Sequence, residues 1–269
     1  MPIVMTAQDS ATTYGWAKTG VGTLTFTQNS FDNWAGGGED SWSWLMNVNA
    51  SMNRTEEGYT WNNNLKLAFG QSSVGGADAR KSADELKFES VYTKLMGEFI
   101  NPYAAFTART QLMEGYVYDD MGNKMQSSGI FDPGYFTESI GVGYKPNDNI
   151  QTRFGAAAKQ TIGSEDYFYA DDPDTAGEIE TMKSEFGVES VTDVKMSLAQ
   201  NILFTSKLEA FSNLEALKKV DVNWDNMFTA KVNDLINVSL NIKIYYDYDI
   251  SSIRQLQQTL GIGVSYTLF

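Results

Sequence analysis

The stretch INVSLNIKIYYDYD, residues Ile236–Asp249, decides the fold class. Every second residue from Ile236 to Tyr248 is apolar or aromatic, and each residue between them carries a polar group. Successive side chains of a β-strand point to opposite faces, whereas a helix repeats every 3.6 residues. The stretch therefore predicts a long β-strand with one apolar face and one polar face.

The same alternation recurs along almost the whole chain of 269 residues. It predicts about twelve strands, most of them longer than the mean soluble strand of about 5–6 residues. We expect the strands to begin roughly at Val21, Ser41, Tyr59, Asp84, Asn101, Tyr135, Asn149, Glu180, Asn201, Val220, Leu235 and Leu256. The predicted fold class is therefore all-β.

The connections between these strands alternate in length. Short turns are expected at 55–58, 145–149, 199–201 and 233–234, and long loops at 30–40, 114–134 and 163–178. Short turns on one rim and long loops on the other are typical of a transmembrane antiparallel up-and-down β-barrel. An even strand number then places both termini on the periplasmic side. A soluble lipocalin-like barrel or a sandwich would also show alternation, and remains the alternative.

Composition excludes several classes of function. The formal net charge of −14 argues against nucleic-acid binding, which needs clustered basic residues. The chain has no Cys and no His, so thiol nucleophiles, Cys-based zinc sites and imidazole bases are absent from the sequence. A carboxylate pair could still act as acid and base, but no spacing singles one out. We therefore expect neither an enzyme nor a cofactor.

The first ten residues combine a short apolar run with Ala7 and a polar stretch, as at the end of a secretory signal. We interpret residues 1–20 as a signal-peptide tail and N-terminal extension, and 21–269 as the barrel. The alternative is a flexible terminus.

Charged side chains collect on the polar face of the expected strands. They are predicted to line the lumen, where they either set the charge preference of a pore or pair with one another and plug it. The set comprises Glu89, Arg109, Arg153, Lys159, Glu189, Asp193, Lys195, Lys207, Glu209, Asp221, Asp225, Lys231, Lys243 and Asp247.

Two further groups of residues have a predicted place in a barrel. Aromatic side chains near strand ends are typical of the girdles at membrane interfaces, and we assign Trp34, Trp42, Trp44, Trp61, Tyr246 and Tyr248 to them. One long loop is acidic, and Asp171, Asp172 and Asp174 are weak candidates for a cation site. Their spacing does not match a dedicated calcium loop, so a solvated acidic rim is the preferred interpretation.

A motif near the start adds a resemblance. Residues Phe26–Ser41 contain Phe-x-Gln, then Phe-x-Asn-Trp, then a run of Gly followed by Ser. This segment resembles a Bacteroidetes-type family of outer-membrane β-barrels of unknown function. The resemblance implies a fold and a bacterial outer-membrane location, and supplies no catalytic residues. The C-terminal Gly261–Phe269 also resembles the last strand that barrel-assembly machinery recognises, with Leu268 in phase and Phe269 one residue out of phase.

Three functions follow as expectations. The first is a passive channel for small solutes or ions. The second is a non-conducting barrel that supports another envelope protein, and the third and weakest is an enzyme on a barrel scaffold. The expected partners are outer-membrane lipid and lipopolysaccharide, the barrel-assembly machinery and, in the second case, an envelope protein.

Overall fold

A computed structural model describes residues 14–33, 35–119, 121–171, 175, 177–215, 220–247 and 253–269. The described chain forms strands β1 (Gly15–Asn29), β2 (Ser41–Glu56), β3 (Tyr59–Val74), β4 (Arg80–Lys94), β5 (Ile100–Thr110), β6 (Gly115–Tyr118), β7 (Lys124–Ser128), β8 (Gly134–Asn147), β9 (Ile150–Ile162), β10 (Met182–Ala199), β11 (Ile202–Asn213), β12 (Val220–Lys231), β13 (Ile236–Tyr246) and β14 (Gln255–Thr267). Among these residues, no helix is long and apolar enough to span a bilayer.

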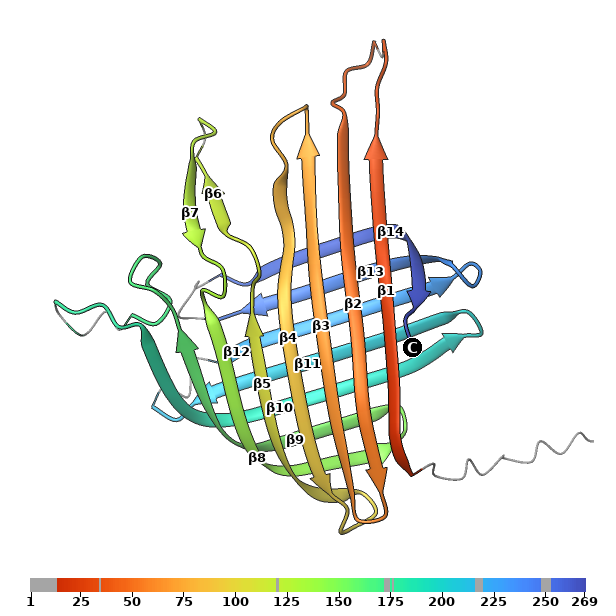
Figure 1. Cartoon of the computed structure of the whole chain (residues 1–269), viewed down its shortest axis with the longest axis vertical. Helices are drawn as coiled ribbons and strands as arrows, with labels where there is room; N and C mark the ends of the chain where they lie inside the picture. Colours follow the sequence, from red (N-terminus) through yellow and green to blue (C-terminus); the bar gives the residue numbers. More distant parts are fainter. Residues whose placement is uncertain are drawn as a thin grey trace, which may run out of the picture.

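Twelve of the strands close into an antiparallel barrel in the order β1-β14-β13-β12-β11-β10-β9-β8-β5-β4-β3-β2. The expected fold class and strand number are confirmed. The remaining strands, β6 and β7, pair only with each other, and Figure 1 shows their hairpin beside the upper ends of β4 and β5. This hairpin lies inside a segment that the alternation pattern assigned to a loop.

The connections fall on two rims, as their lengths predict. The turns 57–58, 95–99, 148–149, 200–201 and 232–235 lie on one rim, named here the short-turn rim. The described parts of the longer segments 30–40, 111–133 and 163–181 lie on the other, the long-loop rim. Because the barrel is antiparallel with an even number of strands, β1 begins and β14 ends at the short-turn rim.

The first strand begins at Gly15 rather than near Val21. Its pairing with β2 runs from Gly15↔Thr55 to Asn29↔Ser41 without a register shift. Residues 1–13 of the expected extension lie outside the described residues. At the closing seam, Leu268 N–H donates to the Gly20 carbonyl (2.7 Å), and Gly20 N–H donates to the Phe269 carbonyl (3.1 Å).

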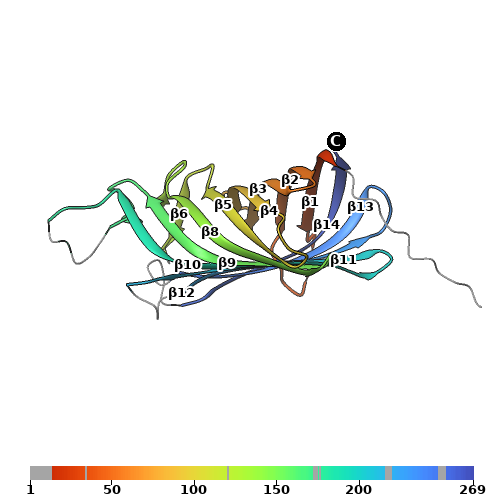
Figure 2. The same ribbon diagram turned by 90° about the horizontal axis from the view of Figure 1, so that it is seen from below.

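The barrel is flattened into two walls. Figure 1 shows β1 to β5 in front, crossing the layer of β10 to β14 at a steep angle, and Figure 2 shows the two layers edge-on. Part of the space between the walls is filled by the buried side chains of Val91, Tyr103 and Ala105. Val191, which is 1% exposed, is the largest fully buried side chain.

Candidate functional site

Burial in this barrel is inverted relative to a soluble protein. Buried side chains include Glu89 (5% exposed), Arg153 (5%) and Lys159 (8%), whereas Phe186 and Leu260 are each 67% exposed. Charged groups avoid burial unless they are paired. The inward positions of the strands therefore form the candidate site, and the next question is how their charges are matched.

Glu89 of β4 is the centre of the first group of ion pairs. It accepts hydrogen bonds from Arg153 Nη2 of β9 (2.7 Å) and from Lys207 Nζ of β11 (2.8 Å). Arg153 Nε also reaches Glu189 of β10 (3.4 Å), and the Ser139 hydroxyl of β8 donates to the same carboxylate (2.9 Å). Two basic residues, on β9 and β11, thus converge on one carboxylate of β4.

A second group joins β3 and β4 to β11, β12 and β13. Lys66 Nζ lies 2.6 Å from Asp225 Oδ2 and 3.2 Å from Glu85 Oε2, and Lys243 Nζ lies 3.2 Å from the same Glu85 oxygen. Lys87 pairs with Glu209. Because β4 and β11 are separated by several strands in either direction around the barrel, these pairs cross its interior.

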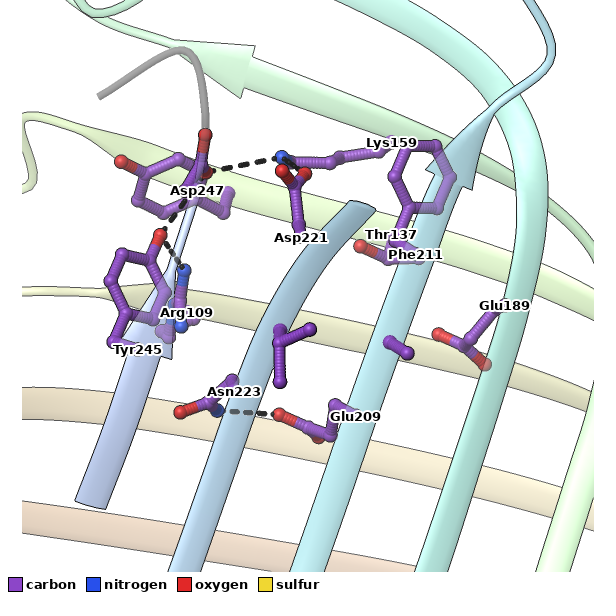
Figure 3. A pocket seen from close by; sticks show the side chains of 13 residues that line it. Arg109, Thr137, Lys159, Glu189, Glu209, Phe211, Asp221, Asn223, Tyr245 and Asp247 are labelled. Atoms are coloured by element: carbon purple, nitrogen blue, oxygen red, sulfur yellow. Dashed lines mark hydrogen bonds and ion pairs between the residues drawn. The ribbon is translucent and has the colours of Figure 1, made fainter. Parts of the chain in front are cut away.

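The third group lies toward the long-loop rim and is drawn in Figure 3. Lys159 Nζ is 2.5 Å from Asp221 Oδ2 and 3.4 Å from Asp247 Oδ2. The Tyr245 hydroxyl donates to Asp247 (3.2 Å) and accepts from Arg109 Nη2 (3.1 Å). Arg109, Tyr245, Asp247 and Lys159 are therefore linked in one chain of polar contacts.

A cavity of about 90 Å³ opens beside this third group. It is lined by residues of β5 and of β8 to β13, together with Asp247, which directly follows β13. The lining residues are Arg109, Tyr135, Thr137, Lys159, Glu189, Glu209, Ala210, Phe211, Asp221, Val222, Asn223, Tyr245 and Asp247. The cavity combines three aromatic rings with donors and acceptors of both charges.

The structure brings most of the predicted lumen residues together, with exceptions at the ends of strands. Asp193 joins the first group through Lys207 (3.2 Å). Lys231 instead pairs with Asp234 in an exposed turn (2.8 Å), and Lys195 is exposed near the short-turn rim. These two cations lie near the short-turn rim and take no part in the ion pairs that cross the barrel.

Sequence reasoning missed some members of the three groups. The predicted set lacks Lys66, Glu85, Lys87 and Glu185, although each lies on the inward face of its strand, as Glu89 does. The alternation signal was present there, because Leu86 and Phe88 occupy the opposite face of β4. Tyr135 and Tyr245 were missed because an aromatic residue on the polar face is not distinctive.

Four of the six aromatics assigned to girdles are described, and they lie near the ends of their strands. Trp61 at the start of β3 contacts Trp16 of β1 (ring centroids 5.8 Å apart), and Trp44 near the start of β2 contacts Phe69 (5.5 Å). Trp42 and Tyr246 are partly exposed at the long-loop ends of their strands. Trp34 and Tyr248 lie outside the described residues.

No group of acidic residues suited to a metal ion occurs among the residues that the structure describes. Of the weak candidates, Asp171 is described, and Asp172 and Asp174 lie outside the described part.

The family comparison matches part of the chain. A family model described as "Protein of unknown function (DUF3078)" matches residues 26–116, less than half of the sequence. This range contains Phe26–Ser41, the segment that carries the resemblance noted above. The Bacteroidetes origin remains a prediction. No curated protein matches the chain.

Similar solved structures are outer-membrane barrels of low sequence identity. The translocator domain of the autotransporter NalP from Neisseria meningitidis is 10% identical over 96% of this chain and 90% of that chain, with a TM-score of 0.40. The NanC porin is 8% identical over 93% and 100% of the two chains, with a TM-score of 0.42. An outer membrane channel from Pseudomonas putida F1 is 9% identical over 96% of each, with a TM-score of 0.42.

Proposed function

We propose that this protein is a bacterial outer-membrane β-barrel that forms a narrow channel for small ions and polar solutes. The observation that carries the proposal is the inverted burial of its side chains. Apolar residues such as Ile140, Phe186 and Leu260 are more than half exposed on the outer surface, and the charged residues face inward. In water such an outer surface would be an aggregation hazard, whereas in lipid it is the required surface.

The orientation follows from the rims. Outer-membrane barrels have short periplasmic turns and longer extracellular loops. We therefore infer that the short-turn rim faces the periplasm and that the long-loop rim, with the cavity beside Arg109 and Lys159, faces outward. Trp16 and Trp61 would then lie at the periplasmic interface, and Trp44 at the outer one. Lipid, lipopolysaccharide and the barrel-assembly machinery are the partners that this placement implies.

The three groups of ion pairs would constrict the channel. A solute must pass between side chains that already satisfy one another across the barrel, so passage requires these pairs to separate or to exchange with the solute. Conduction needs binding that is weak enough for release. A dense set of paired charges therefore favours small, slow conductance over the wide opening of a large porin.

A second candidate is a non-conducting barrel that supports another envelope protein. The observation that favours it is the filled interior, where Val91, Tyr103 and Val191 are each at most 5% exposed and the ion pairs join opposite walls. The folded barrel would then have no open path for ions or solutes.

Conductance in planar bilayers decides between the two. The purified chain is first shown to be folded by heat-modifiable gel migration. Small, reproducible current steps that become larger in Lys207→Met support the channel, because this variant removes one cation from Glu89. The matched control is Lys145→Met, which removes a cation from the exposed turn pair with Asp148. A folded wild type and a folded Lys207→Met that are both silent would reject the channel in favour of the supporting barrel.

A further inference from the structure

We propose that the cavity beside Arg109 binds a small neutral polyhydroxylated molecule, of the size of glycerol or one sugar ring. This inference deepens the proposed function, because it names the class of solute that would enter from the long-loop rim. It rests on the unmatched hydrogen-bonding groups of the cavity wall and on the balance of its charges.

Arg109 supplies unused donors. Its guanidinium lies over the rings of Tyr135 (4.8 Å to the centroid) and Tyr245 (5.0 Å), and among the described residues its hydrogen bond goes to the Tyr245 hydroxyl. Within the described part of the chain, no carboxylate lies within salt-bridge distance of Arg109. A guanidinium carries five N–H donors, so several remain for a ligand that can accept hydrogen bonds.

Asn223 supplies an unused acceptor. Its Nδ2 donates to Glu209 Oε2 (2.7 Å), whereas its Oδ1 is buried and has no hydrogen-bond partner among the described residues. A buried acceptor without a partner is costly. Asn223 lines the same cavity as Arg109, so the occupant must also donate a hydrogen bond. A simple carboxylate only accepts and an ammonium only donates, whereas a hydroxyl group does both.

Each carboxylate of the cavity wall already contacts a basic side chain. Glu189 contacts Arg153, Glu209 pairs with Lys87, and Asp221 and Asp247 share Lys159. An added anion would meet these four carboxylates, and an added cation would compete with lysines that are already in place. A neutral ligand neither places negative charge beside the carboxylates nor competes with the lysines. It is therefore favoured over an anion and over a cation.

The size and the aromatic wall agree with this class. The volume of about 90 Å³ is below the range of about 300–1,000 Å³ that is typical of drug-sized ligands. Phe211, Tyr135 and Tyr245 add ring carbons to the cavity wall, and the C–H groups of a compact polyol can pack against them. Figure 3 shows Arg109, Asn223 and Phe211 on different strands around this cavity.

The test measures binding directly and does not depend on conductance. Saturation-transfer NMR on the folded protein in detergent uses D-glucose and glycerol as probes, with acetate, tetramethylammonium and glycine as comparison solutes. The expected result is weak, saturable transfer to glucose or glycerol only. The same titration should move the Arg109 Nε–H resonance, identified by its loss in Arg109→Lys. If the folded protein gives no current but still binds glucose, the channel function is rejected and the binding proposal stands.

Variants locate the site. Asn223→Leu should weaken glucose binding about tenfold, because leucine has a volume similar to that of asparagine but lacks the buried acceptor Oδ1. The matched control is Asn64→Leu on β3, outside the cavity, and it should leave binding unchanged. If Asn223→Leu does not fold, Phe211→Leu removes an aromatic face instead. Stronger binding of acetate, tetramethylammonium or glycine than of glucose, equal loss in both Asn variants, or no saturable binding would overturn the proposal.

Discussion

Lys66 of β3 and Asp225 of β12 lie 159 residues apart in the sequence, and their side chains meet in the barrel interior with an Nζ–Oδ2 distance of 2.6 Å. They stand on opposite walls, so the contact reports how closely those walls approach. Lys66 also pairs with Glu85 (3.2 Å), and Asn241 donates to the second oxygen of Asp225 (2.5 Å). Removing Lys66 would thus leave two carboxylates short of a partner.

We predict that Lys66→Met destabilises the folded barrel. Breaking a fully buried pair costs about 3–5 kcal/mol. Lys66 and Asp225 keep 31% and 21% of their side chains exposed, so solvent screening reduces the expected loss to about 1–3 kcal/mol. The measurement is urea unfolding followed by tryptophan fluorescence. The exchanged pair Lys66→Asp with Asp225→Lys should recover part of the loss. A Lys66→Met variant as stable as Lys145→Met would contradict the structural role of this pair.

The outer surface gives a prediction about depth in the membrane. Leu260 lies in the middle of β14 and Tyr266 near its end, and both are 67% exposed. A lysine on the lipid-facing surface costs about 2–4 kcal/mol at the bilayer midplane and about 0–1 near the interfaces. Leu260→Lys should therefore destabilise the barrel in lipid vesicles much more than Tyr266→Lys does. Equal losses at the two positions would argue against a membrane around this strand.

The strands could be predicted where alternation is uninterrupted, as in β13, where Val238 and Leu240 face out between polar neighbours. The start of β1 could not. Its outward positions after Trp16 are Lys18, Gly20 and Gly22, and these residues carry no apolar signal. Strand pairing with β2 extends the structure to Gly15 nevertheless, because backbone hydrogen bonds do not depend on the outward side chain.

For the site, the sequence indicates which face a residue occupies but does not name its partner. Lys207 and Glu209 were both predicted to face the interior. Their partners, Glu89 and Lys87, lie on the other wall, and that choice depends on the flattening and the tilt of the whole barrel. Which residues meet across the barrel is set by the geometry of the closed sheet, and alternation within one strand does not encode it.

The close approach of the β8 and β9 backbones leads to a third prediction. Gly141 of β8 pairs with Gly155 of β9, and a Cβ atom built at Gly141 would lie 2.2 Å from the Phe154 carbonyl oxygen. Because the obstacle is backbone, it cannot rotate away. Gly141→Ala should destabilise the barrel by about 1–3 kcal/mol, as overpacked sites do.

Gly22 of β1 provides the matched control, since nothing lies within 4 Å of its added Cβ. Gly22→Ala should change the urea midpoint little, whereas Gly141→Ala should lower it. Two equal midpoints would mean that β8 and β9 relax apart without cost.

The β6–β7 hairpin gives a pH-dependent prediction outside the barrel wall. Asp119 Oδ1 accepts hydrogen bonds from the backbone N–H of Met121 (2.9 Å) and of Asn123 (2.8 Å), and Oδ2 accepts from Asn123 Nδ2 (2.9 Å). The hydrogen bond from the Asn123 side chain, followed by those from the backbone, holds the pKa of Asp119 below its usual value. The ionised carboxylate therefore favours the ordered tip.

A lowered pKa fixes the direction of the pH effect. The stabilisation is present above the ordinary Asp pKa of about 3.9 and is lost as the pH falls through the lowered value. The amide resonances of Met121 and Asn123 should thus keep their positions at pH 4 and shift only at lower pH, in an NMR titration of the folded barrel. Asn123→Ala should raise the midpoint toward the ordinary value, because it removes the largest contribution. A wild-type midpoint at or above about 3.9 would show that the carboxylate does not hold the tip of the hairpin.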